Sequence, residues 1–107
     1  MPSLLDLAGG GLGEVPEHDR YTADAVAAVI EKPTFGATAL SAALVDYDEI
    51  EFVGFCTDIC VISNALLVKA FCPEKHISVD AACCAGVTPE SHTIVLNAMR
   101  ACQIEVR

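Results

Sequence analysis

The sequence has no long hydrophobic run and few basic residues. No stretch of 18 apolar residues occurs, which excludes a transmembrane helix. Residues 1–13 contain no basic residue, so they do not resemble a secretory signal peptide. Six Lys and Arg residues stand against 15 Asp and Glu, giving a net charge of −9. This charge argues against a surface for nucleic acids or for anionic membranes.

Motifs for phosphate, redox and metal sites are also missing. The glycine run 9–13 is not followed by Gly-Lys-Ser/Thr, and no strand is predicted before it, so a phosphate loop is not expected. Cys56 and Cys60 are spaced C-x₃-C, which differs from the redox spacing C-x-x-C. No Cys or His partners stand at zinc-finger spacing, and no two of the three histidines are spaced as ligands on one face. We therefore expect neither a metal nor a cofactor site in this chain.

The composition is that of one compact domain with free thiols. A chain of 107 residues forms one domain at most, and 53% hydrophobic residues provide ample material for a core. The six cysteines lie in apolar periodic segments and not in a loop-rich framework. This favours reduced thiols and a cytoplasmic location.

Strands and helices alternate along the chain. Residues 1–23 predict a loose N-terminal arm, and 24–107 a single α/β domain. The apolar runs and capping residues predict strands at 25–30, 50–55, 76–80 and 103–106, and helices at about 38–47, 58–71 and 88–102. This order is typical of a parallel sheet with helices on its faces, and we expect a three-layer α/β/α fold.

The periodicity also predicts which helix faces are buried. In the helix from Asp58, the apolar positions taken as one face are Ile59, Ile62, Leu66, Leu67 and Ala70. In the helix that Thr88-Pro89-Glu90 opens, the predicted inner positions are Val95, Ala98, Met99 and Cys102.

Candidate functional residues gather at strand ends. Lys32, the segment 56–60 and the segment 80–84 each follow a predicted strand. The carboxyl ends of parallel strands share one edge of the sheet, where ligands bind, so we expect these segments to converge.

Cys60 is the candidate nucleophile. It lies in the first turn of a helix, where unpaired N–H groups and the helix dipole favour a thiolate and can stabilise an oxyanion. A buried inert cysteine is the alternative. For Asp80, the interpretation that we prefer is a carboxylate that caps nearby backbone N–H groups. Cys83 and Cys84 are interpreted as packing residues. Phe35 fits a substrate pocket wall and core packing equally well.

The segment Gly54 to Val61 resembles the nucleophile turn of the isochorismatase-like cysteine hydrolases, a family that includes nicotinamidases. Three further pieces follow the family order: Val29 to Phe35, Val79 to Ala81, and the closing helix and strand to Val106. The resemblance covers about residues 24–107. The family opens with a strand ending in aspartate and a metal-binding segment, and nothing in this chain matches either. The chain is thus expected to correspond to the carboxyl-terminal portion of the family domain, with the family's metal site in the absent segment.

The resemblance implies a function and residue roles. Cys60 would attack an amide carbon–nitrogen bond of a small molecule, and Lys32 would be catalytic and stabilise the thiolate. Backbone N–H groups of Cys56 and Cys60 would form the oxyanion hole. The Phe55–Cys56 peptide would be cis. We expect impaired catalysis without the family's aspartate, and a homo-oligomer.

Two other classes of function stay open. One is a non-catalytic remnant or assembly subunit, which the missing aspartate favours. The other is a flavodoxin-like binder that holds a phosphate or cofactor at the same helix N-terminus, with Cys60 and Lys32 as bystanders.

Overall fold

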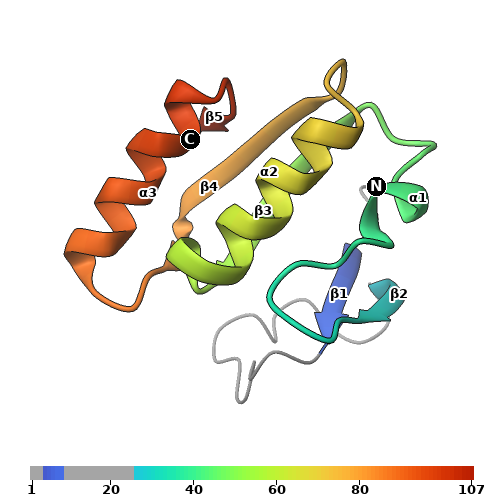
Figure 1. Ribbon diagram of the computed structural model, residues 1–107, viewed down its shortest axis with the longest axis horizontal. Coiled ribbons are helices and arrows are strands. Elements are labelled where there is room, and N and C mark those ends of the chain that lie inside the picture. The colour runs from blue at the N-terminus through green and yellow to red at the C-terminus, as the bar shows by residue number, and fades with distance from the viewer. Residues whose placement is uncertain (1–3, 9–25) are drawn as a thin grey trace.

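A computed structural model describes residues 4–8 and 26–107 of the chain as an α/β fold (Figure 1). Each strand predicted after residue 24 is present, and so is each predicted helix, although the first is a single turn. The elements are β1 (Leu4–Ala8), β2 (Val26–Glu31), α1 (Leu40–Ala43), β3 (Glu49–Phe55), the π-helical turn η3 (Thr57–Val61), α2 (Ile62–Phe71), β4 (His76–Ala85), α3 (Pro89–Ala101) and β5 (Glu105–Val106).

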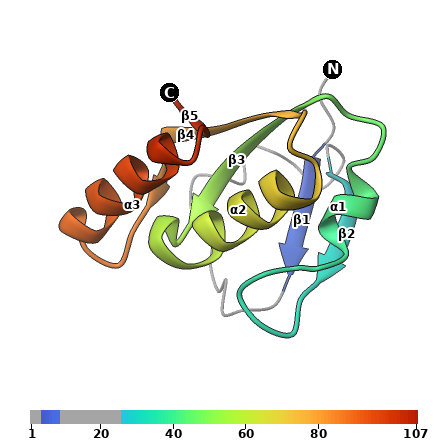
Figure 2. The same ribbon diagram turned by 45° about the horizontal axis from the view of Figure 1, so that its top comes forward.

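All the strand pairs are parallel, as the alternating pattern predicts. β1 pairs with β2 in a two-stranded sheet, and β3, β4 and β5 form a second sheet in that order. Figure 2 shows β1 and β2 side by side. The prediction of a loose arm over residues 1–23 is wrong for residues 4–8, which form β1. This strand also directly precedes the glycine run, contrary to expectation; residues 9–25 lie outside the described part.

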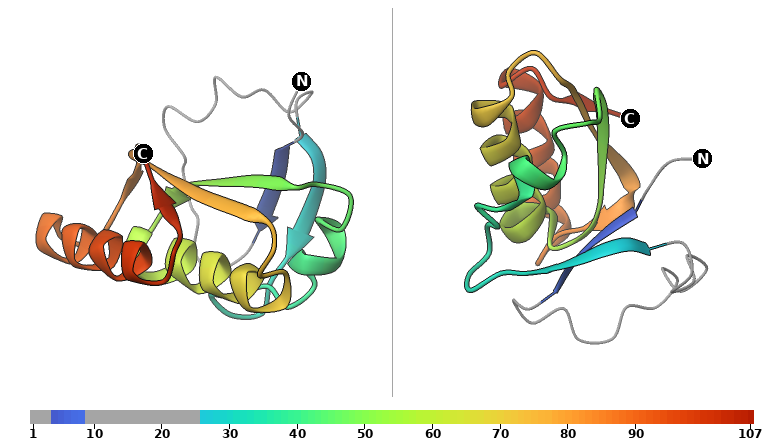
Figure 3. Two further views of the ribbon diagram at one scale, coloured as in Figure 1. Left: turned by 90° about the horizontal axis from the view of Figure 1, so that it is seen from above. Right: turned by 90° about the vertical axis from the view of Figure 1, so that its right-hand side faces the viewer.

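The helices of the described residues lie on one face of the β3–β4–β5 sheet (Figure 3). Strand residues Ile77 and Val79 are fully buried against Val68 of α2 and Met99 of α3 in one apolar cluster. Burial of these side chains stabilises the fold at about 25 cal/mol per Å² of apolar area removed from water. The packing fixes where each strand ends, and thereby where the candidate site lies.

The buried helix faces differ from the predicted ones. Ala70 is exposed, and the buried residues of η3 and α2 are Thr57, Cys60, Val61, Asn64, Ala65 and Val68. The π-helical turn shifts the phase of the following helix, because it holds one more residue per hydrogen-bonded ring than an α-helix.

The inner face of α3 is also corrected. Met99 is buried as predicted, but Leu96 is the other buried residue, while Ala98 and Cys102 are exposed. The start of α3 is as predicted: the Thr88 side chain accepts a hydrogen bond from the Ser91 N–H (3.0 Å), and Pro89 occupies the first turn.

The end of α3 leads directly into β5. Gln103 has φ 67°, and the N–H groups of Gln103 and Ile104 donate to the carbonyls of Arg100 and Met99, both at 3.0 Å. This is a Schellman motif with glutamine at the left-handed position, where glycine is usual.

β4 is longer than predicted and continues to Ala85, so Cys83 and Cys84 belong to a strand. The pairing register with β3 shifts between Phe52 and Gly54, opposite the segment 79–84. Within the described ranges, no helix has the length and apolar character needed to cross a membrane.

Candidate active site

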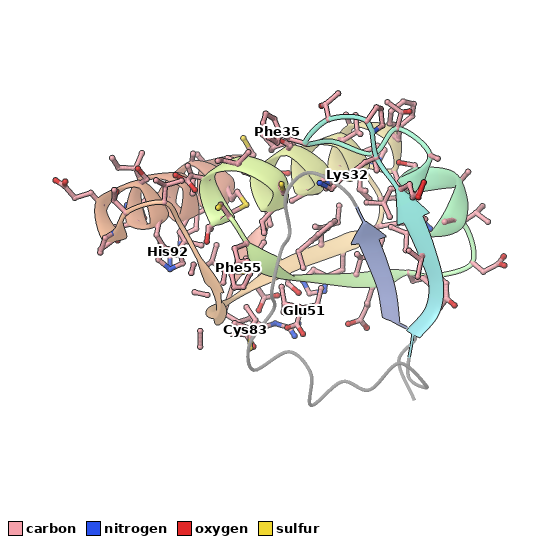
Figure 4. The ribbon with its side chains drawn as sticks, turned by 90° about the horizontal axis from the view of Figure 1, so that it is seen from below. Lys32, Phe35, Glu51, Phe55, Cys83 and His92 are labelled. Carbon is pink, nitrogen blue, oxygen red and sulfur yellow. The ribbon has the colours of Figure 1, made fainter. Side chains whose placement is uncertain are left out.

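Cys60 and Lys32 meet at the carboxyl ends of β3 and β2. The Lys32 Nζ donates to the Cys60 Sγ at 3.6 Å across 28 residues of sequence, and the two residues are 5% and 9% exposed. Figure 4 shows the Lys32 side chain pointing from the end of β2 towards the helices. The contact places a lysine amine, a group that can stabilise a thiolate, directly beside the candidate nucleophile.

The turn that carries Cys60 begins at a cis Phe55–Cys56 peptide, as the family resemblance implies. Gly54, just before it, has φ 122°, a conformation that other residues rarely adopt. Burial, with the nearby Asp58 and Cys60 charges, raises the pKa of the Cys56 thiol. Cys56 therefore stays protonated, which suits a residue whose expected contribution is its backbone N–H.

The cysteines of β4 are poorly suited to nucleophilic chemistry. Burial raises the pKa of Cys84 to about 11, a rise that the neighbouring Cys83 and Asp80 charges add to. The Cys83 thiol donates to the Asp80 carboxylate at 3.4 Å. Asp80 also accepts from the Ala82 N–H at 3.1 Å, so its preferred interpretation as a backbone-capping carboxylate agrees with the structure.

Asn64, which the sequence analysis did not select, connects the loop after Lys32 to the turn that carries Cys60. It lies one turn after Cys60 and is 1% exposed. Its side chain bonds to the backbone of Cys60, Phe35 and Ala37. The signal available in the sequence was a single amide side chain within a mostly apolar helix.

His92 and Asp58 join the nucleophile turn to the β4–α3 connection. The Thr57 Oγ1, in a residue with no exposed surface, lies 2.8 Å from the His92 Nδ1. Asp58 accepts from the Val87 N–H at 3.1 Å. Asp58 is thus engaged with this connection and not with the start of its own helix. No sequence pattern indicated the Thr57–His92 pair, because it depends on tertiary packing across 35 residues.

The Phe35 side chain is 51% exposed, which rules out the core-packing interpretation. In Figure 4 it lies on the outer side of the loop after Lys32. Over the described ranges, no three His, Cys, Asp or Glu side chains lie close enough together to hold a metal ion.

Residues 14–107 match the isochorismatase domain. The nicotinamidase of Staphylococcus aureus is 25% identical with a TM-score of 0.72, and the match covers 98% of this chain and 72% of that one. The nicotinamidase of Bacillus subtilis is 25% identical with a TM-score of 0.65, covering 83% of this chain and 51% of that one. A zinc complex of the Pyrococcus horikoshii pyrazinamidase shares the fold at 23% identity and a TM-score of 0.65, covering 88% and 53%. None of the curated proteins compared with the sequence matches it.

The domain match, together with the parallel α/β fold, places this chain among the isochorismatase-like hydrolases. Because the domain match spans most of its length, the chain belongs to the isochorismatase family. It spans 72% of the staphylococcal neighbour and about half of the other two.

Proposed function

We propose that the chain is a cysteine hydrolase that cleaves an amide carbon–nitrogen bond of a small molecule, as a nicotinamidase does. The observation that carries this proposal is the 3.6 Å contact between the buried Lys32 ammonium group and the Cys60 sulfur. The names of the structural neighbours suggest nicotinamide and pyrazinamide as first substrates.

In the proposed reaction the Cys60 thiolate attacks the amide carbonyl carbon and forms a tetrahedral oxyanion. Backbone N–H groups of Cys56 and Cys60 would stabilise this oxyanion. The carbon–nitrogen bond then breaks, the amine leaves with a proton, and a thioester remains on Cys60. Water attacks the thioester, releases the carboxylic acid and restores the thiol. Phe35 is a proposed wall of the substrate pocket.

The proton donor and acceptor is the missing part of this scheme. In the family, an aspartate that ends the first strand takes the thiol proton and passes it to the leaving amine. Among the carboxylates near the site, Asp58 and Asp80 are engaged with backbone N–H groups. Loss of a general acid–base group costs a factor of roughly 10² to 10⁴ in rate, so we propose that the chain alone is a weak amidase.

Ammonia release from nicotinamide and pyrazinamide tests the proposal. We expect little turnover by the chain alone, and turnover that depends on Cys60 when a family-type first half is fused to it. Robust turnover by the chain alone, abolished by Cys60→Ala, would show that the base lies within it, and Asp80 would be the first candidate. A fusion that stays inactive would favour the non-catalytic subunit instead.

A further inference from the structure

The buried Asn64 side chain uses all of its hydrogen-bonding groups between two segments. Its Oδ1 accepts from the Ala37 N–H at 2.8 Å. Its Nδ2 donates to the Phe35 carbonyl at 3.0 Å and to the Cys60 carbonyl at 2.8 Å. The amide therefore holds the loop after Lys32 and the turn of Cys60 together at a site closed to water.

The chemistry of this position requires an amide. The Ala37 N–H can only donate, and the Phe35 and Cys60 carbonyls can only accept, so the Asn64 oxygen must face Ala37 and the nitrogen must face the carbonyls. A carboxylate of the same shape would present oxygen to both carbonyls and provide no donor. An apolar side chain would leave three backbone groups, those of Ala37 and Cys60 buried and that of Phe35 partly buried, without these partners.

The same loop sets the position of Lys32. Pro33 fixes φ directly after Lys32, and the two backbone groups that Asn64 binds follow at residues 35 and 37. Lys32 is 5% exposed, and its long side chain loses much rotamer freedom when held at the sulfur. A loop held in place by Asn64 lowers that cost because the lysine backbone is already at the correct distance.

We propose that Asn64 is a positioning residue for the Lys32–Cys60 pair: it acts on the thiol by holding the lysine loop against the nucleophile turn. This inference rests on the proposed function for its catalytic meaning. Its physical content is independent of that function, because it concerns the reactivity of Cys60 towards any small electrophile. A purely structural asparagine would stabilise the fold without changing what Lys32 does to the sulfur.

A double-mutant cycle separates these two roles. The rate of Cys60 alkylation by iodoacetamide is measured by peptide mapping with fragment sequencing at pH 7 for the wild type, Asn64→Leu, Lys32→Met and the double variant. An opposite charge at this range changes the thiolate population by about tenfold or more, which corresponds to about one pH unit. We expect Asn64→Leu to slow alkylation about tenfold when Lys32 is present, and less than about twofold when position 32 is methionine.

The pH profile and a matched control complete the experiment. The midpoint of alkylation against pH should move upward in Asn64→Leu towards that of Lys32→Met. Asn97→Leu makes the same change at an exposed position of α3 and should leave both the rate and the midpoint unchanged. An equal slowing by Asn64→Leu in both lysine backgrounds, or no slowing at all, would overturn the proposal.

Two further points keep the test decisive. If circular dichroism shows that Asn64→Leu does not fold, the same cycle with Asn64→Ser is interpreted by the same criteria. No amide substrate is used, so failure of the proposed amidase activity leaves the result of the cycle intact. Conversely, if the amidase assay is positive but the effects of Asn64→Leu and Lys32→Met on alkylation are additive, only the role of Asn64 is rejected and the proposed function stands.

Discussion

Cys60 differs from the other cysteines in its local electrostatics. It follows the start of a helical segment and touches a lysine, whereas Cys72 and Cys102 are the C-caps of α2 and α3. The positive end of a helix dipole favours a thiolate and the negative end opposes one. The positions of these three cysteines in their helical segments therefore predict that their thiols differ in reactivity.

We predict that Cys60 is the most reactive of the six thiols towards a small reagent, although Cys83 and Cys102 are more exposed. Brief labelling with iodoacetamide followed by peptide mapping checks this. Because Cys60 is only 9% exposed, a bulky maleimide should lose this preference. Preferential labelling of Cys72 or Cys102 by iodoacetamide would contradict the prediction.

The Thr57–His92 pair predicts a stability effect. His92→Ala removes the partner of a hydroxyl group that has no exposed surface, and an unsatisfied buried polar group costs about 1–3 kcal/mol. His92→Asn can place a polar atom near the position of Nδ1 and should recover part of this loss. Urea unfolding of the two variants measures the difference; equal stability of His92→Ala and the wild type would mean that water replaces the histidine.

At the scale of elements, the end of α3 contains a residue in an unfavourable conformation. Left-handed φ costs a non-glycine residue about 1–2 kcal/mol, and Gln103 has φ 67°. We predict that Gln103→Gly stabilises the protein by about 1 kcal/mol and that the β-branched control Gln103→Val destabilises it. Thermal unfolding checks both. A destabilising Gln103→Gly would show that the glutamine side chain contributes more than its backbone costs.

β5 is connected to its neighbours by ionic contacts that predict a pH dependence. The Arg107 Nε donates to the Glu105 Oε2 at 3.1 Å, and the His76 Nε2 lies 2.7 Å from the Glu105 Oε1. These contacts lower the pKa of the Glu105 carboxyl below its ordinary 4.5. A lowered folded-state pKa means that the stabilisation is present above 4.5 and is lost as pH falls through the lowered value. Glu105→Gln should therefore be less stable than wild type near neutrality and equal to it in strong acid. The control Glu74→Gln, at an exposed position, should show no such convergence in acid unfolding curves.

Local patterns predicted most elements but not all of their details. The order of strands and helices after residue 24 follows from apolar runs and caps such as Thr88. β1 was missed because five residues containing Asp6 carry no local strand signal and become a strand only by pairing with β2. The buried face of α2 was misplaced because a π-helical turn is not visible in a 3.6-residue periodicity.

For the candidate site, Lys32 and Cys60 meet as expected. The rule that parallel strands of one sheet end at a common edge does not fully account for this meeting, because β2 and β3 lie in different sheets. Asn64 and His92 were not predicted. Each acts through a hydrogen bond to a segment far away in sequence, and such contacts are set by packing and not by local composition.

At the scale of the whole molecule, the sheet suggests self-association. Of the described strands, β4 is the one that pairs with β3, so β3 presents an edge to further strands. We predict a homo-oligomer: sedimentation should give a mass of at least two chains, and the unfolding temperature should rise with protein concentration. A single-chain mass with a concentration-independent unfolding temperature would contradict this.

The separation of Lys32 and Cys60 in sequence has a consequence for the order of folding. The segment 57–71 can begin to form from local hydrogen bonds, but the lysine reaches the sulfur only after a loop of 28 residues closes. Closing such a loop costs about 3 kcal/mol of chain entropy, which the packed core must first offset. The lysine therefore acts on the thiol only late, when the tertiary structure is complete, and until then Cys60 reacts as an ordinary accessible cysteine, like the other five.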